Sequence, residues 1–239
     1  MNGALQQLGQ SPAAVVRLTL PAWKPDPRAG KKPEGDWHKL PDSFIGALKT
    51  AEPFVGRNHG VLLDSECAYA TDNCVLIEIE LGGAVPSATI PHWLIRHLIK
   101  LSVSPSQMCV SSRSIAFAWE DGSWVESAPC SALPANVIAK FEEWHEPHWE
   151  MTAAWKKEFR AIAKVSDETI ILGPDHIRGG RGQLSMSSAV EIPVAEGTVW
   201  NPVVLGRVIK VAERIDFSSW PDPACFAFSG GRGFVVGKN

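Results

Sequence analysis

Apolar side chains recur at helical spacing in four segments of the chain. These segments are Asp42–Phe54, His92–Leu101, Thr152–Val165 and Pro202–Ile215. The last segment has the clearest start, because Asn201 is a residue type that caps helices and Pro202 suits a first turn. The pattern therefore predicts four amphipathic helices.

Short apolar runs rich in β-branched and aromatic residues lie between and after these helices. They predict strands at Gly60–Leu63, Val75–Leu81, Met108–Ser111, Ser114–Trp119, Trp124–Ala128, Thr169–Leu172, Gln183–Ser187, Val190–Val194, Ala224–Phe228 and Gly233–Val236. Several strands follow one another without a helix between them, which favours antiparallel pairing. The predicted class is α+β, with helices packed on one face of an antiparallel sheet.

The same order of elements occurs twice. The helix starts at 42, 92, 152 and 202 repeat with an offset of 110 residues, and Trp124-Val125 matches Phe234-Val235 at the same offset. We therefore expect two copies of one domain, each with two helices on antiparallel sheet. The predicted divisions are an N-terminal arm at 1–36 with a candidate edge strand at Val15–Leu20, a first domain at 37–130, a linker at 131–151 and a second domain at 152–239.

Composition adds an expectation about location. Of the 239 residues 45% are apolar, yet no apolar run reaches the roughly 18 residues that a membrane span requires. The beginning of the chain lacks the pattern of a signal peptide, and the five cysteines are widely spaced and odd in number. We expect a cytoplasmic protein with reduced cysteines and no membrane partner.

Charge separates the helices from the rest of the chain. The four predicted helices carry net charges of −1, +2, +3 and +2, a total of +6, whereas the whole chain carries −3. In the third helix Lys156, Arg160 and Lys164 share one face. One basic face is usually just a solvated helix surface. Three such faces on a repeated element favour a shared polyanionic partner.

Local sequences resemble the DNA sliding clamp family. Ala70-Thr71-Asp72-Asn73-Cys74-Val75-Leu76 is similar to the bacterial Ala-Thr-Asp-Gly-His-Arg-Leu segment, and Leu133-Pro134-Ala135 to the Phe-Pro-Asp link between domains. Trp200-Asn201-Pro202 resembles the Phe-Asn-Pro helix start, and Phe234-Val235-Val236 the final strand. The resemblance covers about 37–239 and matches the second and third domains of the bacterial DNA polymerase III beta subunit.

The resemblance implies a closed ring of six such domains, with helices lining the hole and sheets outside. Two domains per chain imply a homotrimer, and the short form with bacterial-type motifs is typical of a phage or another mobile element. The ring encircles double-stranded DNA without reading its sequence. The implied DNA-facing residues are Arg96, Lys100, Lys156, Lys157, Arg160, Lys164, Arg207, Lys210 and Arg214.

Clamps also bind DNA polymerase and the clamp loader through a short peptide motif laid in an apolar groove. The resemblance places that groove at Thr71, Asn73, Cys74, Val75, Leu76, Pro134, Ile138, Ala139 and Val235. An alternative interpretation makes the apolar members ordinary core residues. Asn73-Cys74-Val75 stands where the family has Gly-His-Arg, so the motif that binds is not specified by the sequence.

Two other interpretations compete with a ring. His145 and His148 are candidates for zinc ligands in a metal-dependent hydrolase, but Pro147 breaks the helix that would align them, and a solvated linker explains them better. The second alternative is a monomeric adaptor or inhibitor with the clamp fold, which binds a replication or transcription protein without encircling DNA.

Other features do not indicate an enzyme. The glycine-rich runs at 177–182 and 230–233 lack the Lys-Ser/Thr and helix of a nucleotide site, and we expect hairpin turns there. Tryptophan is abundant, but its usual role is core packing. We expect this role for Trp93, Trp119, Trp124, Trp155 and Trp200. The sequence predicts no catalytic residues, no metal and no cofactor.

Overall fold

The computed structural model describes residues 32–238 apart from 57–58, 132, 183 and 195–196. The predicted edge strand Val15–Leu20 and most of the predicted arm lie outside the described residues. The chain divides between Pro33 and Glu34 into two units, and the second contains every helix and strand of the described part.

Four helices form where the apolar periodicity predicted them. They are α2 (Phe44–Ala51), α3 (His92–Leu98), α5 (Ala153–Val165) and α6 (Pro202–Val211). The side chain of Asn201 accepts hydrogen bonds from the amides of Val203 and Val204 at 2.9 and 3.1 Å, as the sequence predicted for this cap. The described part of the chain also has short helical turns at η1 (Glu52–Phe54), α4 (Ala135–Ile138) and η2 (Ala139–Glu143).

The predicted end of the last helix is wrong. Helix α6 stops at Val211, because the chain becomes extended at Ala212 and Arg214–Ile215 forms strand β12. This strand pairs with β13 and β7, and the pairing outweighs the helical periodicity of its sequence. Helix α3 also ends early, so that Lys100 lies in the turn that follows it.

The strands of the described residues form three antiparallel sheets. Their bounds are β1 (Trp37–Lys39), β2 (Gly60–Thr71), β3 (Val75–Pro91), β4 (Gln107–Val110), β5 (Ile115–Ala118), β6 (Trp124–Ser127), β7 (Trp149–Glu150), β8 (Ile170–Gly173), β9 (His176–Arg181), β10 (Leu184–Ala189), β11 (Thr198–Trp200), β12 (Arg214–Ile215), β13 (Ala224–Phe228) and β14 (Gly231–Val235). The sheet orders are β1-β4-β5-β6, β10-β9-β8-β11 and β2-β3-β14-β13-β12-β7.

Several strands differ from the sequence prediction. Val190–Val194 is not a strand, since the amides of Val190 and Ile192 bond to Asp175 and Pro174 instead of to a sheet. The first glycine-rich run lies largely within β9, and only Gly182 belongs to the turn. The second run does hold a hairpin turn, at Ser229-Gly230 between β13 and β14.

A glycine in β9 has a packing role that composition does not reveal. A Cβ atom at Gly179 would lie 2.0 Å from Ser166 Oγ and 2.9 Å from Ile162 Cγ2. Glycine therefore lets strand β9 approach the end of helix α5 closely. The glycine-rich run that the sequence assigned to a turn therefore lies where strand β9 packs against helix α5.

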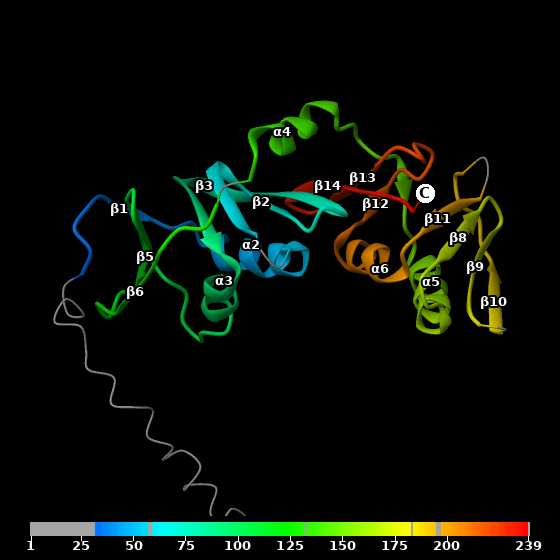
Figure 1. Ribbon diagram of the computed structural model, residues 1–239, viewed down its shortest axis with the longest axis horizontal. Helices are drawn as coiled ribbons and strands as arrows, with labels where there is room; N and C mark the ends of the chain where they lie inside the picture. Colours follow the sequence, from blue (N-terminus) through cyan, green and yellow to red (C-terminus); the bar gives the residue numbers. More distant parts are fainter. Residues whose placement is uncertain (1–31, 57–58, 132, 183, 195–196, 239) are drawn as a thin grey trace, which may run out of the picture. The chain divides into compact units, whose positions relative to one another are not determined.

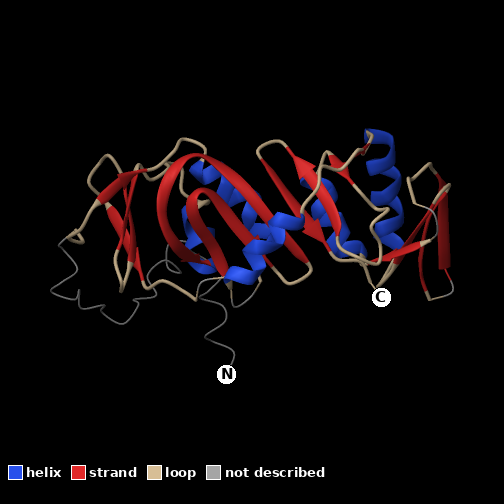
Figure 2. Ribbon diagram, turned by 90° about the horizontal axis from the view of Figure 1, so that it is seen from above, coloured by secondary structure: helices blue, strands red, loops and turns tan. Residues whose placement is uncertain are grey.

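The helices and sheets are arranged as the predicted α+β class requires. Helices α2, α3, α5 and α6 lie on one side of the strands and α4 on the other (Figure 1). In the view from above, short helices lie in front of the central strands (Figure 2). One buried cluster contains residues of all four longer helices, among them Phe44, Leu94, Phe159 and Leu205. Among the described residues, no helix is long and apolar enough to cross a membrane.

The tryptophan prediction holds for only part of the set. Trp155 and Trp200 are 3% and 0% exposed, as expected for core residues. Trp93 is 59% exposed, so the expectation that it packs in the core is wrong. Helix α3 buries Leu94, Ile95 and Leu98, and residue 93 falls on the opposite face of the helix.

Candidate nucleic-acid interface and partner groove

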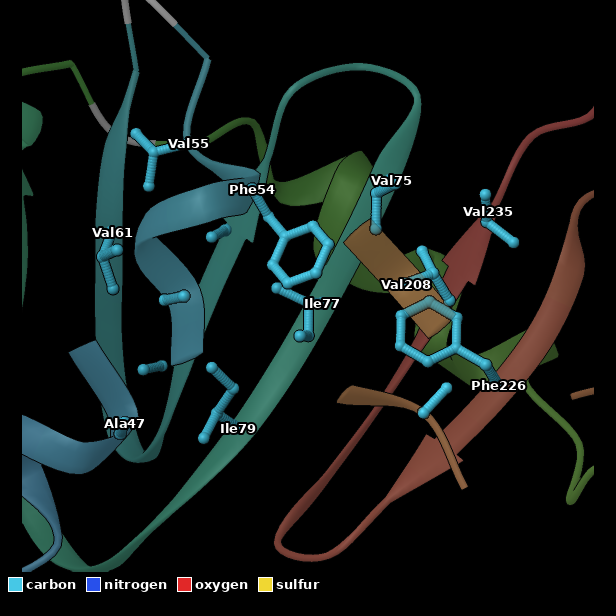
Figure 3. Close-up of a cluster of buried hydrophobic side chains, with 14 of the residues drawn as sticks. Ala47, Phe54, Val55, Val61, Val75, Ile77, Ile79, Val208, Phe226 and Val235 are labelled. Atoms are coloured by element: carbon cyan, nitrogen blue, oxygen red, sulfur yellow. The ribbon is translucent and has the colours of Figure 1, made fainter. Parts of the chain in front are cut away.

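One sheet joins the two repeats. Strand β3 of the first repeat pairs with β14 of the second, with Val75 opposite Val235 and Ile77 opposite Gly233. On the helix side of this pairing the core is shared, and Figure 3 shows Val75 and Ile77 near Val208 and Phe226. The junction between the repeats is therefore a continuous sheet with a continuous core.

An ion pair reinforces this junction beside the core. Arg207 on α6 contacts the carboxylate of Asp72, which lies between β2 and β3. The same guanidinium donates a hydrogen bond of 2.7 Å to the carbonyl of Pro53, and it lies 6.0 Å from the ring centroid of Phe54. Asp72 also accepts hydrogen bonds from the amides of Cys74 and Val75. Arg207, predicted to face DNA, is engaged within the chain.

Three other predicted DNA-facing residues also have partners within the chain. Lys156 donates a 2.7 Å hydrogen bond to the carbonyl of Ala212. Arg214, which is in a strand instead of a helix, pairs with Glu146. The Arg96 side chain remains 60% exposed although its Nε lies 3.6 Å from Glu52. The remaining predicted residues are exposed: Lys100, Lys157, Arg160, Lys164 and Lys210.

The predicted peptide groove divides between the two faces of the junction sheet. Successive side chains of a strand point to opposite faces, so Val75 and Leu76 face different layers. Val75 and Val235, 1% and 0% exposed, belong to the main core. Leu76 belongs to a second cluster with Leu62, Tyr69, Leu133 and Phe141, and Ile138 packs against it.

The remaining predicted groove residues differ in exposure. Thr71 is buried, and its hydroxyl donates to the carbonyl of Val75 at 2.7 Å. Asn73 has a positive φ of 71° and is exposed with Cys74. Pro134 and Ala139 are exposed on the predicted linker.

A histidine of the predicted linker is held by the second repeat. His145 Nε2 lies 3.0 Å from the Asp216 carboxylate, and its Nδ1 lies 3.4 Å from Cys225 Sγ. Burial opposes ionisation of Asp216, but hydrogen bonds from Ser218 and His145 outweigh it and hold the pKa of this carboxyl below its usual value. Burial raises the pKa of the Cys225 thiol. Among the described residues, no group of three or more His, Cys, Asp or Glu side chains is arranged to hold a metal ion.

Solved structures provide the comparison that decides the fold. No protein-family model and no curated protein sequence matches this chain. The Helicobacter pylori beta clamp bound to a DNA ligase peptide is similar with a TM-score of 0.71 and 11% identity, covering 87% of this chain and 68% of that one. Caulobacter crescentus pol III beta has a TM-score of 0.67 and 14% identity, with coverage of 87% and 68%.

A third structure is similar to the same extent. The Pseudomonas aeruginosa sliding clamp bound to griselimycin has a TM-score of 0.67 and 13% identity, covering 90% of this chain and 68% of that chain. The chain has the fold of a bacterial sliding clamp. The resemblance noted in the sequence is therefore confirmed at the level of the fold.

The clamp fold of this chain contains one prominent polar group that the sequence interpretation missed. Arg232 on β14 donates a 2.6 Å hydrogen bond to Glu78 on β3, and its guanidinium lies 5.2 Å from the rings of both Phe141 and Trp144. The hydrogen bond to Glu78 raises the pKa of Arg232. Arg232 thus links the junction sheet to the segment that crosses its outer face. Its position in a glycine-rich run concealed this role.

Proposed function

We propose that the chain is the subunit of a DNA sliding clamp, a ring that serves as a processivity factor in DNA replication. The observation that carries this proposal is the pairing of β3 with β14 at the junction. The repeat offset of 110 residues relates Val75–Ile79 to 185–189, in β10, and Phe234-Val235 to Trp124-Val125, in β6. Within the described part of the chain, the counterparts of the two joined strands are thus both edge strands of separate sheets.

Edge strands present unpaired backbone groups that favour pairing with another chain. Pairing β6 of one copy with β10 of the next would repeat the internal junction between copies. Such a contact is head to tail, so copies joined in this way close into a ring when the rotation fits. With two repeats per chain, six repeats give a homotrimer. The chain then acts as a non-enzymatic scaffold.

The DNA contact is assigned to the side of the sheets on which the four longer helices lie. The exposed cations Lys157, Arg160, Lys164 and Lys210 belong to α5 and α6, and Lys100 follows α3. Side chains of this kind neutralise phosphates without reading bases, so binding to duplex DNA is sequence-independent and weakens steeply with salt. The engaged cations Arg207, Lys156 and Arg214 contribute less than their sequence positions predicted.

The partner groove is assigned to the second cluster, on the outer face of the junction. Ile138, Trp144 and Phe234 are only partly buried there. This surface suits a short apolar peptide motif of DNA polymerase or of a clamp loader. We place the protein in the cytoplasm of a bacterium, or of the host if it is phage-encoded.

An edge-strand substitution tests the assembly. Met186 on β10 is 41% exposed, and a lysine on an edge strand blocks pairing. We expect Met186→Lys to convert a trimer into a monomer in light scattering. Ile171→Lys is the matched control, because Ile171 is 37% exposed in the same sheet but on the central strand β8. If Met186→Lys remains a trimer, β10 is not the edge strand that pairs between copies. If the parent protein is itself a monomer, the alternative of a monomeric adaptor is favoured.

A further inference from the structure

Trp93 leaves a large aromatic side chain in solvent on a helix whose other apolar residues are buried. Its ring belongs to α3, and 59% of the residue is exposed. The repeat counterpart, Val203 on α6, is 68% exposed. Both repeats thus direct an apolar side chain outward at this position, but only the first provides an aromatic ring. Single exposed apolar residues are common on protein surfaces, so the side chains around Trp93 decide which partner it fits.

The surroundings of Trp93 are cationic. Arg96 lies three residues further along the helix, with its side chain 60% exposed, and Lys100 is exposed beyond it. Glu52 is the carboxylate next to this group, and it lies 3.1 Å from His92 Nε2 and 3.6 Å from Arg96 Nε. Glu52 therefore offsets one positive charge and leaves the Arg96 side chain largely exposed. Trp93, His92 and Arg96 line a hollow of about 670 Å³ that also includes His59 and Cys130.

An aromatic ring with cations three and seven residues further along the chain matches the alternation of bases and phosphates in a nucleic-acid strand. Bases stack on aromatic side chains, and the phosphates that follow them bind arginine and lysine. We propose that Trp93 stacks on an unpaired base and that Arg96 and Lys100 hold the adjoining phosphates of a single DNA strand. The bases of a duplex are already stacked on one another and present only their edges, so the ring selects single-stranded segments.

This site adds strand selectivity to the proposed clamp, and it rests on the proposed DNA-facing role of α3. In a ring on duplex DNA it would bind where the duplex gives way to a single strand. An apolar peptide is a poorer occupant, because the apolar surface at Trp93 is bordered by Arg96 and histidines.

The test is fluorescence anisotropy with labelled oligothymidylate and, separately, labelled duplex DNA, on the full chain. We expect Trp93→Ala to weaken oligothymidylate binding by about 10- to 100-fold. Trp93→Phe should retain most of the affinity, because it keeps a stacking face. Val203→Ala is the matched control on the other repeat and should bind as the parent does. Urea unfolding midpoints should be unchanged, since Trp93 is exposed.

Two outcomes overturn the inference. One is unchanged oligothymidylate binding by Trp93→Ala. The other is a parallel loss on single-stranded and duplex DNA, which would make Trp93 part of a general DNA surface. Failure of the clamp proposal gives a different result. If the parent protein is a monomer but still prefers oligothymidylate through Trp93, the single-strand site stands and the ring does not.

Discussion

Arg207 and Asp72 contact each other although 135 residues separate them in the sequence. The contact joins helix α6 of the second repeat to the turn between β2 and β3 of the first. The side chains are 25% and 14% exposed, and the Arg207 Nε atom is buried without a partner in the described structure. Helical spacing placed Arg207 in a basic row that the resemblance assigned to DNA, but its side chain contacts the other repeat.

Removing this ion pair should destabilise the fold. Arg207→Ala leaves the Asp72 carboxylate partly buried without its cation, so we expect the free energy of unfolding to fall by about 2–3 kcal/mol in urea titrations. Lys210→Ala, an exposed position on the same helix, should stay within about 0.5 kcal/mol of the parent. Equal effects of the two substitutions would contradict the role assigned to Arg207.

The salt dependence of duplex binding should separate exposed cations from engaged ones. Lys157→Ala and Lys210→Ala should each lower the slope of log K against log salt by about one. Arg207→Ala should leave the slope nearly unchanged, because its guanidinium is occupied by Asp72 and Pro53. The measurement is duplex binding over a range of NaCl concentrations. A reduced slope of log K against log salt for Arg207→Ala would show that Arg207 contacts DNA.

The Asp216 carboxylate should contribute stability that depends on pH. Its pKa is lowered in the folded state, so its contribution is present above the unfolded pKa and is lost as the pH falls through the folded pKa. Asp216→Asn should therefore unfold at lower urea concentration than the parent at neutral pH. The difference should shrink as the pH falls below about 4, near the ordinary aspartate value. A difference that does not change with pH would exclude the charge as its cause.

Gly179 provides a test of the packing between α5 and β9. Gly179→Ala should destabilise the protein by about 1–3 kcal/mol, because its methyl group would overlap Ser166 and Ile162. Gly46 on α2 is the matched control, since a Cβ built there meets no atom within 4 Å beyond its chain neighbours and the backbone of its own helix. Gly46→Ala should stabilise the helix by about 0.5–1 kcal/mol. If Gly179→Ala lowers the stability and Gly46→Ala raises it in thermal or urea unfolding, the contacts at each position determine the effect, and not the loss of a glycine.

The sequence predicted the helices well because apolar periodicity reports directly on a buried face. It placed the end of α6 wrongly because Arg214 and Ile215 pair with strands that are distant in sequence. Periodicity also cannot distinguish Arg207 from Lys210, which share a helix but differ in whether a carboxylate from the other repeat is within reach. Trp93 was misassigned because tryptophan usually packs in a core, although its spacing of three and seven residues from Arg96 and Lys100 places it on the basic side of the segment.

The arrangement of the predicted groove residues could not be read from the sequence, for a similar reason. The resemblance gave candidate segments, but it did not specify on which face of the sheet each side chain lies. Leu76 lies in the outer cluster and Val75 in the main core. The contribution of Arg232 and Phe141 to the outer face depends on pairing between β3 and β14, which no local pattern reveals.

The native mass of the chain in solution shows whether three copies form the proposed ring. Light scattering at physiological salt over a range of protein concentrations measures it without DNA, loader or partner peptide. We expect a species of three times the 26.0 kDa chain mass, the size of a six-repeat ring. A species of 26.0 kDa that does not change with concentration would contradict the ring.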